Sequence, residues 1–162
     1  GSRGSVLPLF MSMLNKGILP ITDIRMTRFM ISLEEGVNMV WHAFKDTIGG
    51  EIYVKKIPSM NVMDIAKAIM PNLKYEIIGI RPGEKLHEQM ISLEDGRSTY
   101  EFKNYFKILP EIHGWSKDPL RINSGNPVKH NFIYSSEINK DWMSVEDLKT
   151  WIGQNSNRIG KI

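Results

Sequence analysis

The sequence predicts an α/β fold, because segments with the two-residue period of a strand alternate with segments of helical period between residues 25 and 90. The clearest helix signal is the S-x-x-E capping box that begins at Ser32 and precedes apolar residues at helical spacing. The clearest strand signal is the apolar run 75–80, which the turn at Pro82 and Gly83 follows. In such folds, ligands bind beyond the carboxyl ends of the strands.

The first expected elements are a helix, a loop and an extended segment. Residues 5–16 are predicted to form the helix, because Ser5 can cap its start and Gly17 follows its last turn. Residues 18–24 are mostly apolar and contain a proline, which favours a loop that leads into a short strand. Residues 25–31 alternate between polar and apolar side chains, which predicts an extended segment.

The central part is predicted to alternate between helices and strands. The helix that begins after Ser32 carries Val37, Val40, Trp41 and Phe44 at helical spacing, and the Gly49-Gly50 pair ends it. The elements expected next are a strand over 51–55, a helix over 62–70 capped by Asn61, a buried strand over 75–80 and a short helix that begins near Glu84.

Beyond about residue 90 the predicted order loosens. Residues 100–109 alternate like a strand, and residues 110–128 are rich in glycine, proline and asparagine. Residues 132–136 are expected to be extended. Ser144 is expected to cap a final helix that reaches Trp151, and the residues after Gly153 are expected to form a loose tail.

The composition is that of a soluble globular protein, with 162 residues of which 41% are hydrophobic and 24% charged. A net charge of +3, with no run of five like charges, argues against a nucleic-acid partner. The absence of cysteine excludes disulfides and cysteine zinc sites, and it is compatible with a cytoplasmic location. No apolar segment approaches the roughly 20 residues that span a bilayer, and no signal peptide is expected, so a membrane partner is not expected either.

The segment 79–88, G-I-R-P-G-E-K-L-H-E, carries the strongest binding signal. Arg81 on the turn can bind a phosphate through two parallel hydrogen bonds, and Glu84 suits a sugar or ribose hydroxyl. Taken alone, these ten residues are better explained as a Pro-Gly turn with a solvated ion pair. The rest of the chain favours the binding site.

Two further features suit an anion. The glycine-rich residues 1–6 lead into a helix N-terminus, where free N–H groups and the helix dipole favour a phosphate. Arg25 and Arg28 lie three residues apart, so both can reach one anionic ligand. Two solvated arginines on an edge strand explain the second pattern equally well.

Catalytic and metal-binding patterns are not found in the sequence. The four histidines are scattered and form no ligand cluster, so a metal site is not expected, and His87 is interpreted as a packing or supporting residue. There is no G-x-G-x-x-G, and no tyrosine is followed by a lysine four positions later. The chain therefore contains residues suited to phosphate binding without a catalytic centre.

Three segments taken together resemble one family: 1–10, G-S-R-G-S-V-L-P-L-F; 25–29, R-M-T-R-F; and 80–88, I-R-P-G-E-K-L-H-E. The family is that of the inverting UDP-N-acetylglucosamine 4,6-dehydratases (5-epimerising), extended short-chain dehydrogenases that begin pseudaminic acid synthesis for flagellin and surface glycans. The resemblance continues through 99–102 and 134–136 to Trp142, and it is to the carboxyl-terminal half of the family only.

This resemblance implies the substrate-binding lobe of an extended short-chain dehydrogenase, a Rossmann-type α/β fold, with an irregular C-terminal extension. The expected division is a UDP-sugar-binding lobe over 1–92, an extension over 93–153 and a loose tail over 154–162. Full-length members hold NADP on an amino-terminal Rossmann domain whose aspartate, lysine and tyrosine carry the proton transfers. The resemblance therefore implies no catalytic residue in this chain, which alone is expected to be inactive, and its partners would be a UDP-sugar, the Rossmann half and further copies of the full-length protein.

The family pattern also implies roles for individual residues. The backbone at Ser5 and Val6 would contact the diphosphate, Thr22 would lie near the uracil, Arg28 and Arg81 near the diphosphate, and Glu84 near the ribose hydroxyls. Two alternatives remain open: a non-catalytic nucleotide- or glycan-binding module, and the sister branch that makes L-fucosamine-type precursors for capsules. The segment 100–102 and Trp115 favour the flagellin-modification branch.

Overall fold

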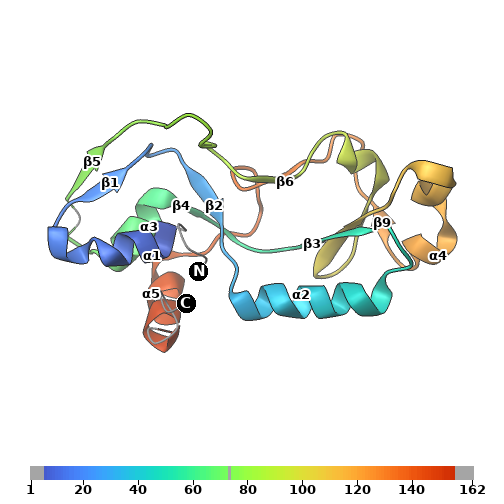
Figure 1. The fold of residues 1–162 in the computed structure, drawn as a ribbon, viewed down its shortest axis with the longest axis horizontal. Coiled ribbons are helices and arrows are strands. Elements are labelled where there is room, and N and C mark those ends of the chain that lie inside the picture. The colour runs from blue at the N-terminus through green and yellow to red at the C-terminus, as the bar shows by residue number, and fades with distance from the viewer. Residues whose placement is uncertain (1–5, 73, 156–162) are drawn as a thin grey trace. The chain divides into compact units, whose positions relative to one another are not determined.

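The computed structural model describes residues 6–72 and 74–155 (Figure 1). The chain forms two compact units, each assembled from segments that are not adjacent in the sequence. Unit 1 contains Gly1–Met30, Pro58–Glu88 and Ser136–Ile162, and unit 2 contains Ile31–Ile57 and Gln89–Ser135. These units do not follow a single cut at residue 92, so the functional division at residues 92 and 153 stays a prediction.

Unit 1 begins with helix α1 (Val6–Ser12), which a short 3-10 helix, η1 (Leu14–Lys16), follows. The single helix predicted over 5–16 is therefore divided in two. Gly17 ends η1 in the left-handed region, with φ of 72°, as the glycine predicted. Ser5, the predicted cap, lies outside the described residues.

Two pairs of short strands follow in unit 1. β1 (Leu19–Ile21) pairs in parallel with β5 (Tyr75–Ile77), and β2 (Thr27–Phe29) pairs antiparallel with β4 (Ser59–Asn61). The prediction of a buried strand over 75–80 was wrong in length and in burial, because all three residues of β5 are exposed. Within the described part of the chain β5 pairs only with β1, so its apolar side chains remain uncovered.

The core of unit 1 lies around helix α3 (Val62–Ile69). Asn61 caps α3 as predicted, since its side chain accepts a hydrogen bond of 2.7 Å from the backbone N–H of Met63. Buried residues of α1, β1 and α3 form one cluster with Leu148 of helix α5 (Val145–Asn155). α5 continues four residues past the predicted end at Trp151, so residues 154 and 155 belong to the helix.

The short helix predicted from Glu84 does not form, and residues 84–88 are irregular. The physical reason is that two of their backbone carbonyl groups already accept hydrogen bonds from another element. The carbonyls of Lys85 and Leu86 accept hydrogen bonds from β2, so they are not available for the bonds of a helix.

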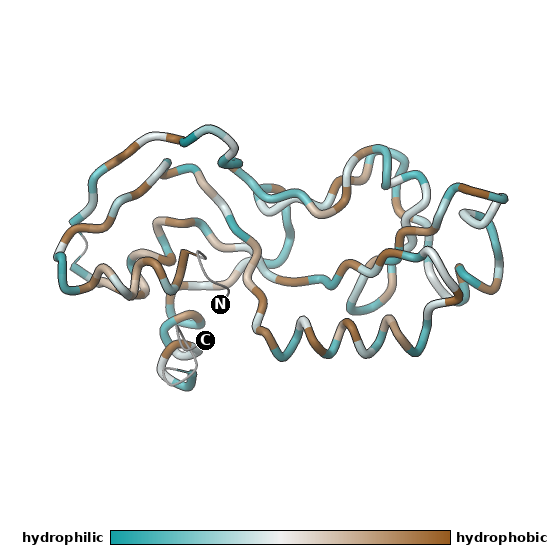
Figure 2. Tube along the Cα trace, in the orientation of Figure 1, coloured by the Kyte–Doolittle hydropathy of each residue, from teal (hydrophilic) through white to brown (hydrophobic). Residues whose placement is uncertain are grey.

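Unit 2 contains α2 (Leu33–Asp46), the longest helix within residues 6–72 and 74–155, and its capping box is confirmed. The Ser32 side chain accepts from the backbone of Glu35, and the Glu35 side chain accepts from the backbone of Ser32. The apolar positions recur along the helix as predicted (Figure 2), but they are exposed. The predicted positions are exposed at 45% for Val37, 53% for Val40, 61% for Trp41 and 72% for Phe44, and Leu33 at the start of the helix is 82% exposed.

A four-stranded antiparallel sheet accompanies α2, in the order β3-β8-β7-β9. Its strands are β3 (Ile52–Lys55), β7 (Thr99–Glu101), β8 (Tyr105–Ile108) and β9 (Asn126–Pro127). The single strand predicted over 100–109 is therefore a hairpin. The chain reverses at residues 102–104, where the Phe102 N–H donates to the Tyr105 carbonyl.

The other elements of unit 2 are short. They are the antiparallel pair β6 (Gln89–Ile91) and β10 (Tyr134–Ser135), the 3-10 helices η2 (Asp95–Ser98) and η3 (Ile112–Lys117), and helix α4 (Pro119–Ile122). β10 lies within the segment 132–136 that was predicted to be extended.

A charged network is buried in unit 2. Lys107 on β8 is only 2% exposed, and its Nζ lies 2.6 Å from Oδ2 of Asp46 at the end of α2. The Tyr53 hydroxyl donates to the same oxygen at 2.7 Å. Lysine is almost never fully buried without a partner, so this pair accounts for the position of Lys107. The network joins α2, β3 and β8.

Candidate functional site

The segment 81–84 forms a closed turn in unit 1. The Glu84 N–H donates to the Arg81 carbonyl at 3.0 Å, and Pro82 and Gly83 occupy the two central positions. Gly83 has φ of 86°, which a type II turn requires at its third residue. Glu84 Oε2 also accepts from the Arg81 N–H at 3.1 Å, so the glutamate stabilises the turn from which it projects.

The side chains of Arg81 and Glu84, at the two ends of this turn, are exposed. Among the described residues, the Arg81 guanidinium makes no hydrogen bond or ion pair, so all its donors are available to a ligand. Glu84 uses one carboxylate oxygen on the backbone, and its other oxygen can accept from a hydroxyl. The turn therefore presents a cationic fork and a carboxylate three residues apart.

The position of the turn agrees with the general rule for α/β folds. β1 and β5 are parallel, and the Ile78 N–H donates to the Ile21 carbonyl where both strands end. Thr22 directly follows β1, and Arg81 follows β5 by four residues. Both residues therefore leave the same end of a parallel strand pair, which is where ligands bind.

Arg28 has a different environment from Arg81. Its Nη1 donates to the carbonyls of Thr27 and Leu86, at 2.7 and 3.1 Å, and its Nη2 donates to the carbonyl of Lys85 at 3.0 Å. Its Nε lies 3.6 Å from the carboxylate of Glu88. Most of its donors are thus engaged by the chain itself, and direct contact between Arg28 and a diphosphate stays a prediction.

Arg25 is also engaged locally. Its Nε and Nη2 donate to the two carboxylate oxygens of Asp23, at 3.0 and 2.7 Å. The hydrogen bonds from the Arg25 side chain and backbone lower the pKa of Asp23 to about 2. The sequence pattern suggested that Arg25 and Arg28 could share one anion, whereas in this structure each contacts different groups of the chain.

His87 lies in a chain of hydrogen bonds. Its Nδ1 is 2.8 Å from the Thr27 hydroxyl, which is 2.7 Å from the Ser136 hydroxyl, and its Nε2 is 3.1 Å from Oε2 of Glu137. Hydroxyl, imidazole and carboxylate in this order resemble the triad of a nucleophilic enzyme. A nucleophile must be reached by its substrate, however, and Thr27 and Ser136 are 5% and 0% exposed. The arrangement therefore serves the structure, as the sequence suggested for His87.

Two of the expected phosphate-binding residues lie at the start of unit 1. Val6 is half-buried at the first position of α1, and Ser5 lies outside the described residues. The position of Val6 is consistent with a ligand at a helix N-terminus. Its contact with a diphosphate remains a prediction.

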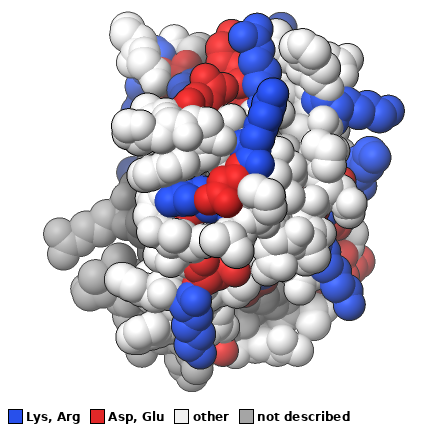
Figure 3. Space-filling model, turned by 90° about the vertical axis from the view of Figure 1, so that its right-hand side faces the viewer, with Lys and Arg blue, Asp and Glu red and all other residues white. Residues whose placement is uncertain are grey.

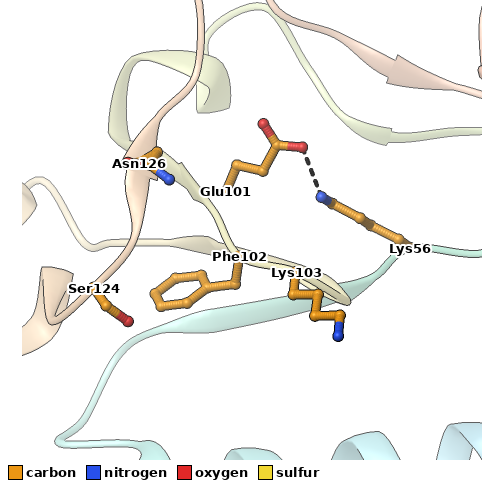
Figure 4. Close-up of a pocket in the computed structure, with 6 residues that line it drawn as sticks. All are labelled: Lys56, Glu101, Phe102, Lys103, Ser124 and Asn126. Atoms are coloured by element: carbon orange, nitrogen blue, oxygen red, sulfur yellow. Dashed lines mark hydrogen bonds and ion pairs between the residues drawn. The ribbon is translucent and has the colours of Figure 1, made fainter.

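Sequence reasoning did not identify a pocket in unit 2 (Figure 4). It encloses about 430 Å³ and is lined by Lys56, Glu101, Phe102, Lys103, Ser124 and Asn126. The Lys56 ammonium lies 2.6 Å from the Glu101 carboxylate, so these two charges largely neutralise each other. The lining residues come from segments far apart in the sequence, and no local pattern signals them.

Neither a metal site nor a membrane span is found in the part of the chain that the structure describes. No group of three or more acidic or histidine side chains there could hold a metal ion. No helix of residues 6–72 and 74–155 is both long and apolar enough to cross a bilayer. Basic and acidic side chains are interspersed on the face drawn in Figure 3, so no large region of one charge forms on that face.

Comparison with known proteins shows the family to which this chain belongs. Residues 1–110 match the family described as polysaccharide biosynthesis protein, and the chain belongs to this family. It is 52% identical over 155 residues to the UDP-N-acetylglucosamine 4,6-dehydratase (inverting) of Campylobacter jejuni serotype O:2, covering 91% of this chain and 46% of that protein. The UDP-glucose 4-epimerase of Rickettsia canadensis is 39% identical over 112 residues, covering 66% of this chain and 33% of that protein.

A solved structure agrees with the fold. The X-ray structure of Pen from Bacillus thuringiensis superimposes with a TM-score of 0.79 at 27% identity, over 96% of this chain and 46% of that one. The predicted α/β class and the resemblance to the inverting dehydratases are therefore confirmed. The chain spans about half the length of the curated dehydratase that it matches.

Proposed function

We propose that this chain is the substrate-binding portion of an inverting UDP-N-acetylglucosamine 4,6-dehydratase, a lyase of nucleotide-sugar metabolism. Its product would be UDP-2-acetamido-2,6-dideoxy-L-arabino-hexos-4-ulose. The observation that carries the proposal is the exposed turn at Arg81 and Glu84, located at the end of the parallel strand pair. The identity of 52% to a dehydratase of this type supports it.

The proposed ligand contacts follow from the chemistry of the residues. Arg81 would bind the diphosphate with two parallel N–H bonds, and Glu84 would accept from the ribose hydroxyls. Thr22, which follows β1, would lie near the uracil. Ser5 and Val6 would offer backbone N–H groups to the diphosphate, and Arg28 would add positive charge nearby.

The cofactor would be NADP, held by a companion Rossmann half of the full-length protein. The sequence carries no G-x-G-x-x-G fingerprint, so its own residues do not fit a dinucleotide and no chemical step is assigned to them. NADP supplies hydride transfer when bound. This chain would bind and orient the UDP-sugar for the companion half.

The exposed face of α2 supports the existence of such a companion. A helix with one apolar stripe is stable when another element covers that stripe, and large exposed apolar patches mark interaction surfaces. Trp41 and Phe44 lie next to each other on α2 with ring centroids 6.1 Å apart, and both are mostly exposed. We propose that the companion half covers this face of α2.

We also propose that the full-length protein is a cytoplasmic homo-oligomer. It would serve the pseudaminic acid branch of flagellin glycosylation.

Turnover assays test the proposed function. We expect the full-length protein to convert UDP-N-acetylglucosamine to the 4-keto-6-deoxy product with the C5 centre inverted, and we expect this chain alone to form none. Product analysis by mass spectrometry and NMR checks both expectations. Product formed by this chain as the sole protein would show that catalysis does not depend on the companion half, and binding of UDP without turnover by the full-length protein would favour a non-catalytic module.

A further inference from the structure

We propose that Arg28 and the Thr27–His87 pair form a clamp that holds residues 85–88, and that this clamp positions the turn at 81–84 for its ligand. The inference rests on the proposed function, because it concerns the same UDP site. It assigns His87 and Thr27 a part in ligand binding without contact with the ligand, and it gives Arg28 a role that does not require such contact.

The first part of the clamp is the Arg28 guanidinium. Its Nη2 holds the carbonyl of Lys85 at 3.0 Å and its Nη1 holds the carbonyl of Leu86 at 3.1 Å. The Thr27 N–H donates to the same Leu86 carbonyl at 3.2 Å. Two successive carbonyls are thereby tied to β2, only one residue beyond Glu84. A planar guanidinium can bridge them because its donors lie on separate nitrogens.

The second part is the hydrogen-bonded chain through His87. Its Nε2 faces the Glu137 carboxylate at 3.1 Å and therefore carries a hydrogen, so in the neutral ring Nδ1 accepts from the Thr27 hydroxyl. Thr27 in turn accepts from the Ser136 hydroxyl, and Ser136 Oγ accepts from the Glu88 N–H at 2.9 Å. Each of the two buried hydroxyls, those of Thr27 and Ser136, then donates once and accepts once, so both are satisfied.

A third set of bonds continues the attachment at Glu88. Its carbonyl accepts from the Ser136 N–H at 2.8 Å, and its carboxylate lies 3.6 Å from Arg28 Nε. Residues 85–88 are thus bonded at every position, either to β2 or to Ser136 and Glu137. Among the hydrogen bonds of the described residues, only the two between Arg81 and Glu84 hold the turn before them.

The consequence is an exposed turn that is followed directly by a fixed segment. An exposed turn loses conformational entropy when a ligand orders it, and a fixed flanking segment reduces that loss before binding. The clamp acts on the whole turn, so it affects the phosphate contact of Arg81 and the ribose contact of Glu84 together. A residue that contacts the phosphate directly, in contrast, affects the binding only of those ligands that carry a phosphate.

This difference supplies the test. In the full-length protein, we expect Arg28→Lys to lower the affinity for UDP and the affinity for uridine by the same factor, about tenfold. Titration calorimetry measures both affinities. Lysine keeps the positive charge but carries all its donors on one nitrogen at the end of a flexible chain, so it cannot reproduce the planar geometry in which Nη1 and Nη2 each hold one carbonyl. The midpoint of thermal unfolding should change little, and at saturating UDP-sugar kcat should be retained while KM rises.

Thr27→Val is the second variant, because valine keeps the shape of the buried side chain and removes only the hydroxyl of the hydrogen-bonded chain. Thr27→Val should lower the affinities for UDP and uridine by similar factors, whereas Thr27→Ser, which keeps the hydroxyl, should leave both affinities close to those of the unmodified protein. Arg97→Lys, at an exposed arginine of unit 2, is the matched control and should bind UDP and uridine as the unmodified protein does.

A loss confined to UDP in Arg28→Lys would overturn the clamp and make Arg28 a direct phosphate ligand. Unchanged affinity for both ligands in Thr27→Val would overturn the part assigned to His87 and Thr27. Failure of the unmodified protein to bind UDP would refute the proposed function itself, and this outcome is distinct from the other two because it appears before any substitution is made.

Discussion

Arg81 and Arg28 show how two arginines expected to lie near the same diphosphate acquire different environments. Arg28 is the middle residue of β2, whereas Arg81 lies on the turn that follows β5. The structure leaves the guanidinium of Arg81 exposed, whereas that of Arg28 donates to backbone carbonyls. The residue type could be read from the sequence, but the partner could not, because those carbonyls lie nearly 60 residues away in the chain.

Replacement of Arg81 by lysine should weaken UDP binding by about tenfold or more. Lysine cannot form two parallel bonds to a diphosphate, and a charge-assisted bond contributes about 1.5–3 kcal/mol, where about 1.4 kcal/mol corresponds to a factor of ten. Uridine binding should hardly change. Calorimetry of both ligands with the full-length protein measures this, and an equal loss for UDP and uridine would assign Arg81 to the fold instead.

Replacement of Glu84 by glutamine should raise KM for the UDP-sugar more than it lowers kcat. Contacts to the ribose act on the ground state and the transition state alike. The amide oxygen of glutamine can still accept from the Arg81 N–H, so the turn should persist. Steady-state kinetics of the full-length protein measure both constants, and a large fall in kcat at unchanged KM would make Glu84 a participant in the chemistry.

At the scale of elements, local signals predicted the caps and helices well. The Ser32 capping box and the Asn61 cap form as expected, since each is decided by residues within one turn. The errors concern segments whose environment is set by distant residues. The segment 84–88 is held by β2 instead of forming a helix, and β5 remains exposed although its composition is that of a buried strand.

The buried network of unit 2 predicts acid sensitivity. Burial alone raises the pKa of Asp46, but the hydrogen bonds and charge of Lys107 and the bond from Tyr53 outweigh it and lower this pKa below the ordinary 3.8. The folded state then binds this proton less readily than the unfolded state does. The contribution of Asp46 to stability should be present above about pH 4 and should be lost as the pH falls through its lowered folded-state pKa.

Denaturant unfolding of this chain between pH 7 and pH 3 measures that contribution. Asp46→Asn should lower the stability near neutral pH by about 3–5 kcal/mol, because it leaves the charge of buried Lys107 without its partner. It should also make stability less dependent on pH. Asp64→Asn, at a half-exposed aspartate of unit 1, is the control and should change both quantities little. A pH dependence that is as steep in Asp46→Asn as in the unmodified chain would contradict this role.

At the scale of the whole molecule, the α/β class and the family could be predicted from motifs that occur in order along the chain. The two compact units could not, because each is built from segments separated by long stretches of sequence. The exposure of α2 was also not predictable, since the apolar period of a helix indicates which face is covered but not which partner covers it. The same is true of the candidate site. The turn at 81–84 could be predicted from neighbouring residues, whereas the clamp could not, because its residues lie far apart in the sequence.

The apolar face of α2 predicts the behaviour of this chain when it is purified alone. We expect it to self-associate, because Trp41 and Phe44 expose large apolar surfaces. A variant with glutamate at both positions should sediment as a smaller species in analytical ultracentrifugation, and Lys45→Glu on the same helix is the control for added negative charge. Identical sedimentation of the unmodified chain and the double variant would show that this face does not drive association.

The interleaving of the two units also sets an order in which they can be completed during synthesis. The chain passes from one unit to the other after residues 30, 57, 88 and 135. Unit 2 has all its segments once Ser135 has left the ribosome, whereas unit 1 still lacks Ser136 and the residues of α5. Thr27 must therefore wait for a hydroxyl 109 positions later before its hydrogen-bonded chain can close. The ligand-binding turn would acquire its support only after unit 2 has all its segments, so a nascent chain would complete unit 2 before it could bind a nucleotide.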